Sequence, residues 1–159
     1  MRAIYVADTE GLVALAAAGT AKTIFGVKGD AGHAIDLLGL TISLDGLTAT
    51  EKSIVVELCA CTWATNAPGT ASTAVTVKQE SGPRIAETFA AAKTWTTEPT
   101  VLTVLEPFDL DPYKYQYKYD FSLGESPDFA VAEGFAVRMT IPSAGAAVNA
   151  RVRGRWARV

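Results

Sequence analysis

Apolar and polar side chains alternate along most of the last third of the chain. Between residues 113 and 120 every second side chain is a tyrosine and the others are polar: Tyr113, Tyr115, Tyr117 and Tyr119 alternate with Lys114, Gln116, Lys118 and Asp120. The same period recurs in residues 135–141 and in residues 148–156. Because successive side chains of a strand point to opposite faces, this pattern predicts half-buried antiparallel β-strands.

Shorter apolar stretches earlier in the chain predict further strands. We expect these strands in residues 2–6, 23–28, 34–44, 53–63, 74–79 and 101–108. In residues 34–44 one face is expected to carry Leu38, Leu40, Ile42 and Leu44. For residues 8–19 the sequence leaves two possibilities, a helical turn or a loose strand. Residues 85–93 are expected to form the one short helix, of about two turns.

The chain therefore has about eight short strands with turn signals between them and no βαβ rhythm. This spacing is typical of an all-β fold, an antiparallel β-sandwich or jelly-roll-like domain with at most one short helix. We expect a single domain over residues 1–159, in which residues 1–20 are a candidate N-terminal arm.

Composition and charge narrow the function classes. The 159 residues are 49% apolar and 19% charged, which is too hydrophobic for disorder. The net charge of −3 lacks the basic excess of a nucleic-acid-binding protein, so we expect no nucleic-acid partner. We also expect no membrane partner, because no apolar run approaches the length that spans a bilayer. Residues 12–18 are not expected to be a signal peptide, because Asp8 and Glu10 precede them.

Cysteine and histidine are scarce. The two cysteines, Cys59 and Cys61, would point to the same face of a strand, a spacing that rarely suits a disulfide. With His33 as the only histidine, the chain does not easily supply a tetrahedral zinc site. We expect buried free thiols, no metal and no cofactor. His33 is expected to be a surface residue of a turn and not the base of a nucleophilic site.

Acidic residues near turns are the remaining candidates for catalysis. Asp109 and Asp111 flank one turn, and Glu125 and Asp128 flank another. Carboxylate pairs of this kind perform glycoside hydrolysis on some folds. Acidic residues beside proline and glycine are also ordinary turn formers, and this is the interpretation that we favour.

Two stripes are candidates for interfaces. Arg151, Arg153 and Arg155 would line the polar face of the last strand, either as a solvated face that guards against stray pairing or as a docking surface for an acidic partner. The tyrosines at 113, 115, 117 and 119 suit either packing between sheets or a subunit interface, because a buried hydroxyl needs a partner.

Several short segments carry a resemblance to a known family. They are Ala21-Lys22-Thr23, Gly32-His33, Ile42-Ser43-Leu44-Asp45-Gly46, Val55-Val56-Glu57-Leu58, Thr94-Trp95-Thr96-Thr97-Glu98-Pro99-Thr100 and the closing strand. Together they resemble small β-sandwich virion proteins of tailed bacteriophages, of the capsid decoration or minor capsid type. The resemblance extends from about residue 20 to residue 159.

The resemblance implies a structural role without catalysis. Such proteins sit on the outside of an icosahedral shell, commonly as trimers, and stabilise it by bridging subunits of the major capsid protein. It also implies synthesis in the host cytoplasm and no catalytic residues to carry over. The first alternative is a tail or baseplate component, or a module that binds host glycans by stacking the tyrosines, Trp63 or Trp95 on sugars. The second is a sandwich enzyme that uses Asp109, Asp111 or Glu125.

Overall fold

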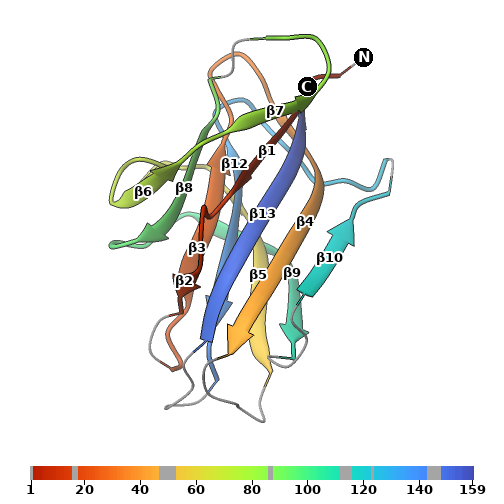
Figure 1. Cartoon of the computed structure of the whole chain (residues 1–159). Helices are drawn as coiled ribbons and strands as arrows, with labels where there is room; N and C mark the ends of the chain where they lie inside the picture. Colours follow the sequence, from red (N-terminus) through yellow and green to blue (C-terminus); the bar gives the residue numbers. More distant parts are fainter. Residues whose placement is uncertain are drawn as a thin grey trace.

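The computed structural model describes residues 2–15, 18–46, 53–85, 88–111, 116–122, 124–142 and 148–159. These residues form thirteen β-strands and no helix. The strands make two antiparallel sheets that pack against each other (Figure 1). The protein is therefore an all-β sandwich, as the alternation predicted.

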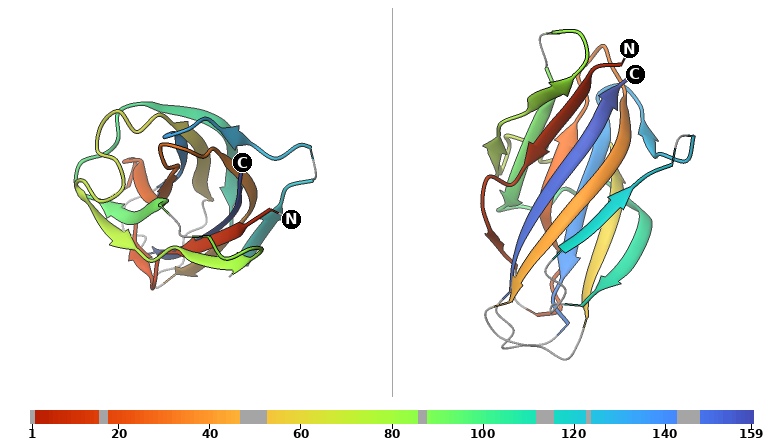
Figure 2. Two further views of the ribbon diagram at one scale, coloured as in Figure 1. Left: turned by 90° about the horizontal axis from the view of Figure 1, so that it is seen from above. Right: turned by 45° about the vertical axis from the view of Figure 1, so that its right-hand side comes forward.

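The first sheet has seven strands. Its main path runs β10-β4-β13-β1-β7, while β11 pairs with β4 and β2 pairs with β13. The strands are β1 (Ile4–Asp8), β2 (Val13–Ala14), β4 (Ile35–Gly46), β7 (Lys78–Ser81), β10 (Gln116–Asp120), β11 (Asp128–Phe129) and β13 (Val148–Arg158). Residues 4–8, within the candidate N-terminal arm, thus form a strand between β13 and β7. The two ends of the chain lie side by side at one end of the sandwich (Figure 2).

The second sheet has six strands, in the order β6-β8-β3-β12-β5-β9. They are β3 (Lys22–Lys28), β5 (Ile54–Cys61), β6 (Ser72–Val75), β8 (Ala90–Trp95), β9 (Leu102–Leu110) and β12 (Gly134–Thr140). The edge strands β9 and β10 come from different sheets and lie on the same side of the sandwich (Figure 1).

The main core fills the space between the sheets. In β13 the inward positions from Val148 to Trp156 are buried, whereas Arg151, Arg153 and Arg155 are exposed. The fully buried ring of Trp156 packs edge-on against Phe135 of β12, with ring centroids 6.3 Å apart. Each buried side chain of this kind contributes about 1.5–3 kcal/mol to folding, so the alternation itself directs the two sheets together.

The helix expected at residues 85–93 is wrong. Residues 90–93 begin β8, and the described residues 85, 88 and 89 lie outside any helix. Ala91 belongs to the main core and Ala92 to a second cluster on the opposite face of the sheet. Alanine has a high helix propensity, but the pairing of β8 with β3 and β6 overrides this weak local preference for a helix.

A β-bulge in β4 shifts the apolar face that the sequence predicted there. Arg155 pairs with Gly39 and Trp156 with Leu37, so Leu38 is an extra residue without a partner in β13. Leu37, and not Leu38, therefore joins Leu40, Ile42 and Leu44 in the core. The carbonyl of Leu38 accepts a hydrogen bond of 3.0 Å from the Phe121 N–H, which ties the end of β10 to the bulge.

A second apolar cluster covers the outer face of the second sheet. Trp63 and Trp95 lie over the small side chains of Cys59, Cys61, Ala92 and Ala136. The indole N–H of Trp63 donates to the Val27 carbonyl at 3.0 Å, and that of Trp95 donates to the Asn66 carbonyl at 2.8 Å. This face of the sheet is therefore not open to solvent at the two tryptophans.

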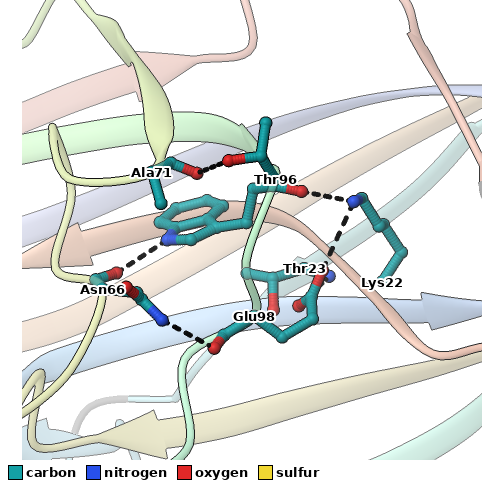
Figure 3. A network of polar contacts seen from close by, with 7 residues as sticks. Lys22, Thr23, Asn66, Ala71, Thr96 and Glu98 are labelled. Carbon is teal, nitrogen blue, oxygen red and sulfur yellow. Dashed lines mark hydrogen bonds and ion pairs between the residues drawn. The ribbon is translucent and has the colours of Figure 1, made fainter.

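Polar contacts fasten the segment after Trp95 to the same sheet. The Asn66 amide donates to the Glu98 carbonyl at 3.0 Å, and the Thr23 N–H donates to the Glu98 carboxylate at 2.8 Å (Figure 3). The Lys22 ammonium lies 3.6 Å from that carboxylate. These contacts hold the loop of residues 62–71 against the segment that follows β8.

Candidate functional site

The three candidate arginines share the outer face of the first sheet. Arg151, Arg153 and Arg155 are exposed on β13, whose neighbours β4 and β1 lie on either side. Opposite them on β4 are Ser43, Thr41 and Gly39. On the β1 side Asp8 pairs with Arg153 and Val6 with Arg155, so the arginines project from a largely polar face on which Val6 is an apolar neighbour.

Glu80 of β7 holds two of these arginines in place. Arg153 Nη2 lies 3.0 Å from Glu80 Oε1, and Arg155 Nε lies 2.5 Å from Glu80 Oε2. Both side chains reach across β1 to make these contacts, since β1 separates β13 from β7. No ion pair of Arg151 occurs among the described residues. The row therefore combines two guanidinium groups held by Glu80 with a third, that of Arg151, which has no ion pair to a described residue.

A shallow depression of about 180 Å³ adjoins the arginines. Gly39 and Leu40 line it together with charged and polar residues: Thr41, Glu80, Lys118, Asp120, Arg153 and Arg155. A Cβ atom on Gly39 would lie 2.9 Å from Asp120 Oδ1 and 3.0 Å from the Tyr119 carbonyl. The glycine thus permits the close approach of β10, and Lys118 and Asp120 form an ion pair of 2.7 Å at this border.

The described part of the tyrosine stripe closes one side of the sandwich. Tyr113 and Tyr115 lie outside the described residues, whereas Tyr117 and Tyr119 are half-buried on β10. Tyr117 stacks on Phe108 of β9 with centroids 5.0 Å apart and planes at 29°. Tyr117 also stacks on Tyr119 at 6.2 Å. The two described tyrosines therefore pack between the edges of the two sheets.

The surroundings of Tyr117 raise the pKa of its phenol. Burial disfavours the phenolate, and the nearby charge of Glu106 and the Tyr119 ring add to the effect. A raised pKa of this kind fits a packing role, since the side chain stays neutral between the two strand edges.

The candidate acidic residues are not gathered in one cavity. Asp109 is exposed near the end of β9, Asp111 is exposed just after it, and Asp128 faces Asp36 in the β11–β4 pair. Glu125 instead lines a groove between β9 and β10 with Glu106 and Asp120. Sequence reasoning did not single out Glu106 or the groove, because the groove depends on how two sheet edges diverge.

His33 lies in the expected turn and contacts an aspartate. Its Nδ1 is 3.0 Å from both carboxylate oxygens of Asp30. Asp30 also accepts hydrogen bonds from the Thr88 hydroxyl and, at 2.7 Å, from the Gly32 N–H. Here the aspartate and not the histidine is the central group, so the arrangement does not place a hydroxyl on the second ring nitrogen in the manner of a catalytic triad.

The cysteines and tryptophans are buried. Cys59 and Cys61 are free thiols, as predicted, and burial raises the pKa of Cys59 to about 11. Trp63 and Trp95 are only 4% and 0% exposed, so neither ring is available to stack on a sugar. The described ranges contain no group of three or more histidine, cysteine, aspartate or glutamate side chains placed to hold a metal ion.

Within the part of the chain that the structure describes, no helix has the length and apolar character needed to cross a membrane. Comparisons with family models, with curated proteins and with solved structures found no match for this chain.

Proposed function

We propose that the protein is a non-enzymatic decoration protein of a tailed-bacteriophage capsid. In this proposal it binds the outer surface of the icosahedral shell as a trimer and stabilises contacts between subunits of the major capsid protein. The resemblance of its short segments to phage virion proteins motivates the proposal, and the β-sandwich fold is compatible with it.

The arginine row on β13 is the observation that carries the proposal. A docking surface must offer groups that recognise a partner, and guanidinium groups bind carboxylates through two parallel hydrogen bonds. Arg151, Arg153 and Arg155 are exposed on a regular strand in the interior of a sheet, so their spacing is set by the backbone. We infer that the partner presents carboxylates to this face.

The Glu80 contacts support docking in a second way. An arginine loses side-chain entropy when it is immobilised at an interface, at a cost of about 0.5–1.5 kcal/mol. Because Glu80 already orders Arg153 and Arg155 in the free protein, these side chains lose less entropy when a partner binds. Glu80 leaves further N–H donors of both guanidinium groups available for a partner.

The alternatives have less support in the described residues. The burial of Trp63 and Trp95 removes two of the rings proposed for a glycan-binding tail module, and Tyr117 is engaged by Phe108. For the sandwich enzyme, Glu125 lines a groove that does not include Asp109 or Asp111. We therefore retain capsid decoration as the proposed function.

The first test is the copy number of the chain in purified particles of the virus that encodes it. Quantitative mass spectrometry against the major capsid protein should give a ratio near one, or a fixed fraction of the shell subunits. A handful of copies per particle would instead indicate a tail or vertex position. Absence from the particle would overturn the proposal.

The second test addresses the docking face. The variant Arg151→Ser/Arg153→Ser/Arg155→Ser should lose occupancy on the shell while its unfolding midpoint changes little, because exposed ion pairs contribute only about 0–1 kcal/mol. The single variant Arg151→Ser is compared with the control variant Arg84→Ser, which removes an exposed arginine just after β7 and outside the arginine row. Unchanged occupancy of the triple variant would remove these arginines from the interface.

A further inference from the structure

A groove of about 310 Å³ opens between the edges of the two sheets, and its lining shares Asp120 with the depression beside the arginine row. Its walls come from β9 of the second sheet and from β10 with the segment that follows it. Phe108 of β9 stacks on Tyr117 of β10, and the groove is lined by the residues that follow Tyr117, among them Tyr119 and Phe121. The groove is therefore the open part of a sandwich side whose other part is closed by aromatic packing.

Apolar and aromatic side chains make up one part of the groove's lining. Leu58 of β5, which is 2% exposed, contributes to the lining, as do Tyr119, Phe121 and Pro127. Leu105 is 46% exposed and also lines the groove. It is the extra residue of a β-bulge, because Glu106 pairs with Leu58 while Val104 pairs with Cys59. Bulges at sheet edges redirect side chains, and this one presents a leucine beside the opening.

Carboxylates make up another part of the lining. The charged side chains that line the groove are Glu106, Asp120 and Glu125, and no described lysine or arginine lines it. Asp120 is paired with Lys118. Neither Glu106 nor Glu125 forms an ion pair with a described residue. The groove thus combines apolar and aromatic side chains with two carboxylates that form no ion pair with a described residue.

The edge of β9 is poorly suited to bind a partner as an added strand. The bulge at Leu105 interrupts the regular ladder, and Pro107 lacks a backbone N–H. Both features are devices that protect edge strands against pairing. The occupant is therefore better described as an inserted side chain than as an extra strand of the sheet.

We propose that the groove binds an arginine side chain presented by a basic segment of a partner protein. The aliphatic stem of arginine would pack on Leu105 and Phe121, as long cationic side chains commonly do on apolar surface. The guanidinium would reach Glu106 and Glu125, which accept its hydrogen bonds, and the nearby Tyr119 ring offers a cation–π contact. A neutral or acidic side chain would leave both carboxylates without a counter-ion.

This inference does not depend on the proposed capsid role. It concerns a different surface with the opposite charge preference from the arginine row, and its test uses the purified protein alone. Failure of one proposal therefore leaves the other standing.

The test is an NMR titration of the isotopically labelled protein with a short capped peptide that contains one arginine between two valines. The control peptide carries citrulline, which keeps the shape of arginine and removes its charge. We expect binding in the millimolar range, with shifts confined to the amides of Leu105, Glu106, Tyr119, Phe121 and Glu125. The citrulline peptide should bind about tenfold more weakly.

Variants locate the binding. The double variant Glu106→Gln/Glu125→Gln should weaken binding of the arginine peptide about tenfold. The control variant Asp109→Asn removes an exposed carboxylate of β9 that lies outside the groove, and it should leave binding unchanged. Native amide dispersion of each variant shows that it is folded. Equal binding of the two peptides, or no shifts at millimolar peptide, would overturn the proposal. Sedimentation that shows self-association lost in Glu106→Gln/Glu125→Gln would also overturn it, because the occupant would then be a second copy of the chain.

Discussion

Trp63 and Trp95 stack on each other over the outer face of the second sheet, with ring centroids 5.8 Å apart and planes at 17°. Trp63 adopts a left-handed backbone conformation, with φ of 55°, just after the end of β5. Such a conformation costs about 1–3 kcal/mol for a bulky residue, so tertiary contacts must offset it. The ring packing and the hydrogen bond to Val27 supply these contacts. This aromatic pair thus anchors the loop of residues 62–71 to the sheet.

Gly26 should be essential for this packing. A Cβ atom at Gly26 would lie 2.6 Å from Trp63 Cη2 and 3.0 Å from Trp95 Cη2. We expect Gly26→Ala to reduce the free energy of unfolding by about 1–3 kcal/mol, because the rings have to move away. Urea unfolding followed by tryptophan fluorescence measures this. Gly32→Ala is the control, since its nearest atom would be 3.6 Å away. Equal stability of the two variants would show that the pair tolerates displacement.

Tyr117 should contribute to stability through its contact with Phe108. We expect Tyr117→Ala to lower the free energy of unfolding by about 1–3 kcal/mol, because it removes a half-buried ring that closes the side of the sandwich. Lys118→Ala, on the exposed face of the same strand, should cost less than about 1 kcal/mol. Chemical denaturation of both variants tests the difference. A Tyr117→Ala protein of unchanged stability that no longer self-associates would instead identify the tyrosines as a subunit interface.

Asp30 should make stability depend on pH in the acid range. Burial raises the pKa of this carboxyl, but hydrogen bonds from Thr88, His33 and the Gly32 N–H outweigh burial and bring the pKa from 3.8 to about 2. Since the pKa is lower in the folded state, the stabilisation is complete above about pH 4 and is lost as the pH falls towards 2.

The variant Asp30→Asn measures this contribution. It should be about 2 kcal/mol less stable than the parent at pH 7, and the difference should shrink as the pH falls from about 4 towards the folded-state pKa of about 2. Denaturation curves at a series of pH values between neutral and strongly acidic give the comparison. Asp109→Asn, at an exposed site on β9, should change stability by less than about 0.5 kcal/mol at neutral pH. A constant difference between Asp30→Asn and the parent across the range would exclude the carboxylate contacts as its origin.

Cys59 and Cys61 should react slowly in the folded protein. Burial raises the pKa of both thiols, that of Cys59 to about 11, so little thiolate forms near pH 8 and the reagent has poor access. We expect labelling by a soluble disulfide reagent to be slow in native buffer and fast after unfolding in guanidinium chloride. Rapid native labelling of either thiol would mean that the tryptophan cluster opens readily.

The sequence by itself determined the sandwich class and the faces of its most regular strands. In β13 a strict period of two places Val152 and Trp156 inside and the three arginines outside, because a strand has no other way to segregate them. The shared face of the two cysteines also followed from their spacing on a strand, and their burial from the apolar character of the thiol side chain. These features depend on local backbone geometry and on the transfer of apolar side chains out of water. Both can be inferred from the order of residues along the chain.

Only the tertiary structure decided the features in which local sequence patterns mispredict the fold. Ala91 and Ala92 belong to a strand because β3 and β6 pair with β8, and Leu38 leaves the core because a bulge in β4 moves the register by one residue. The burial of Trp63 and the groove beside Leu105 arise from segments far apart in the chain. Pairing partners, bulges and the divergence of sheet edges are long-range properties, and a single sequence carries no periodic signal for them.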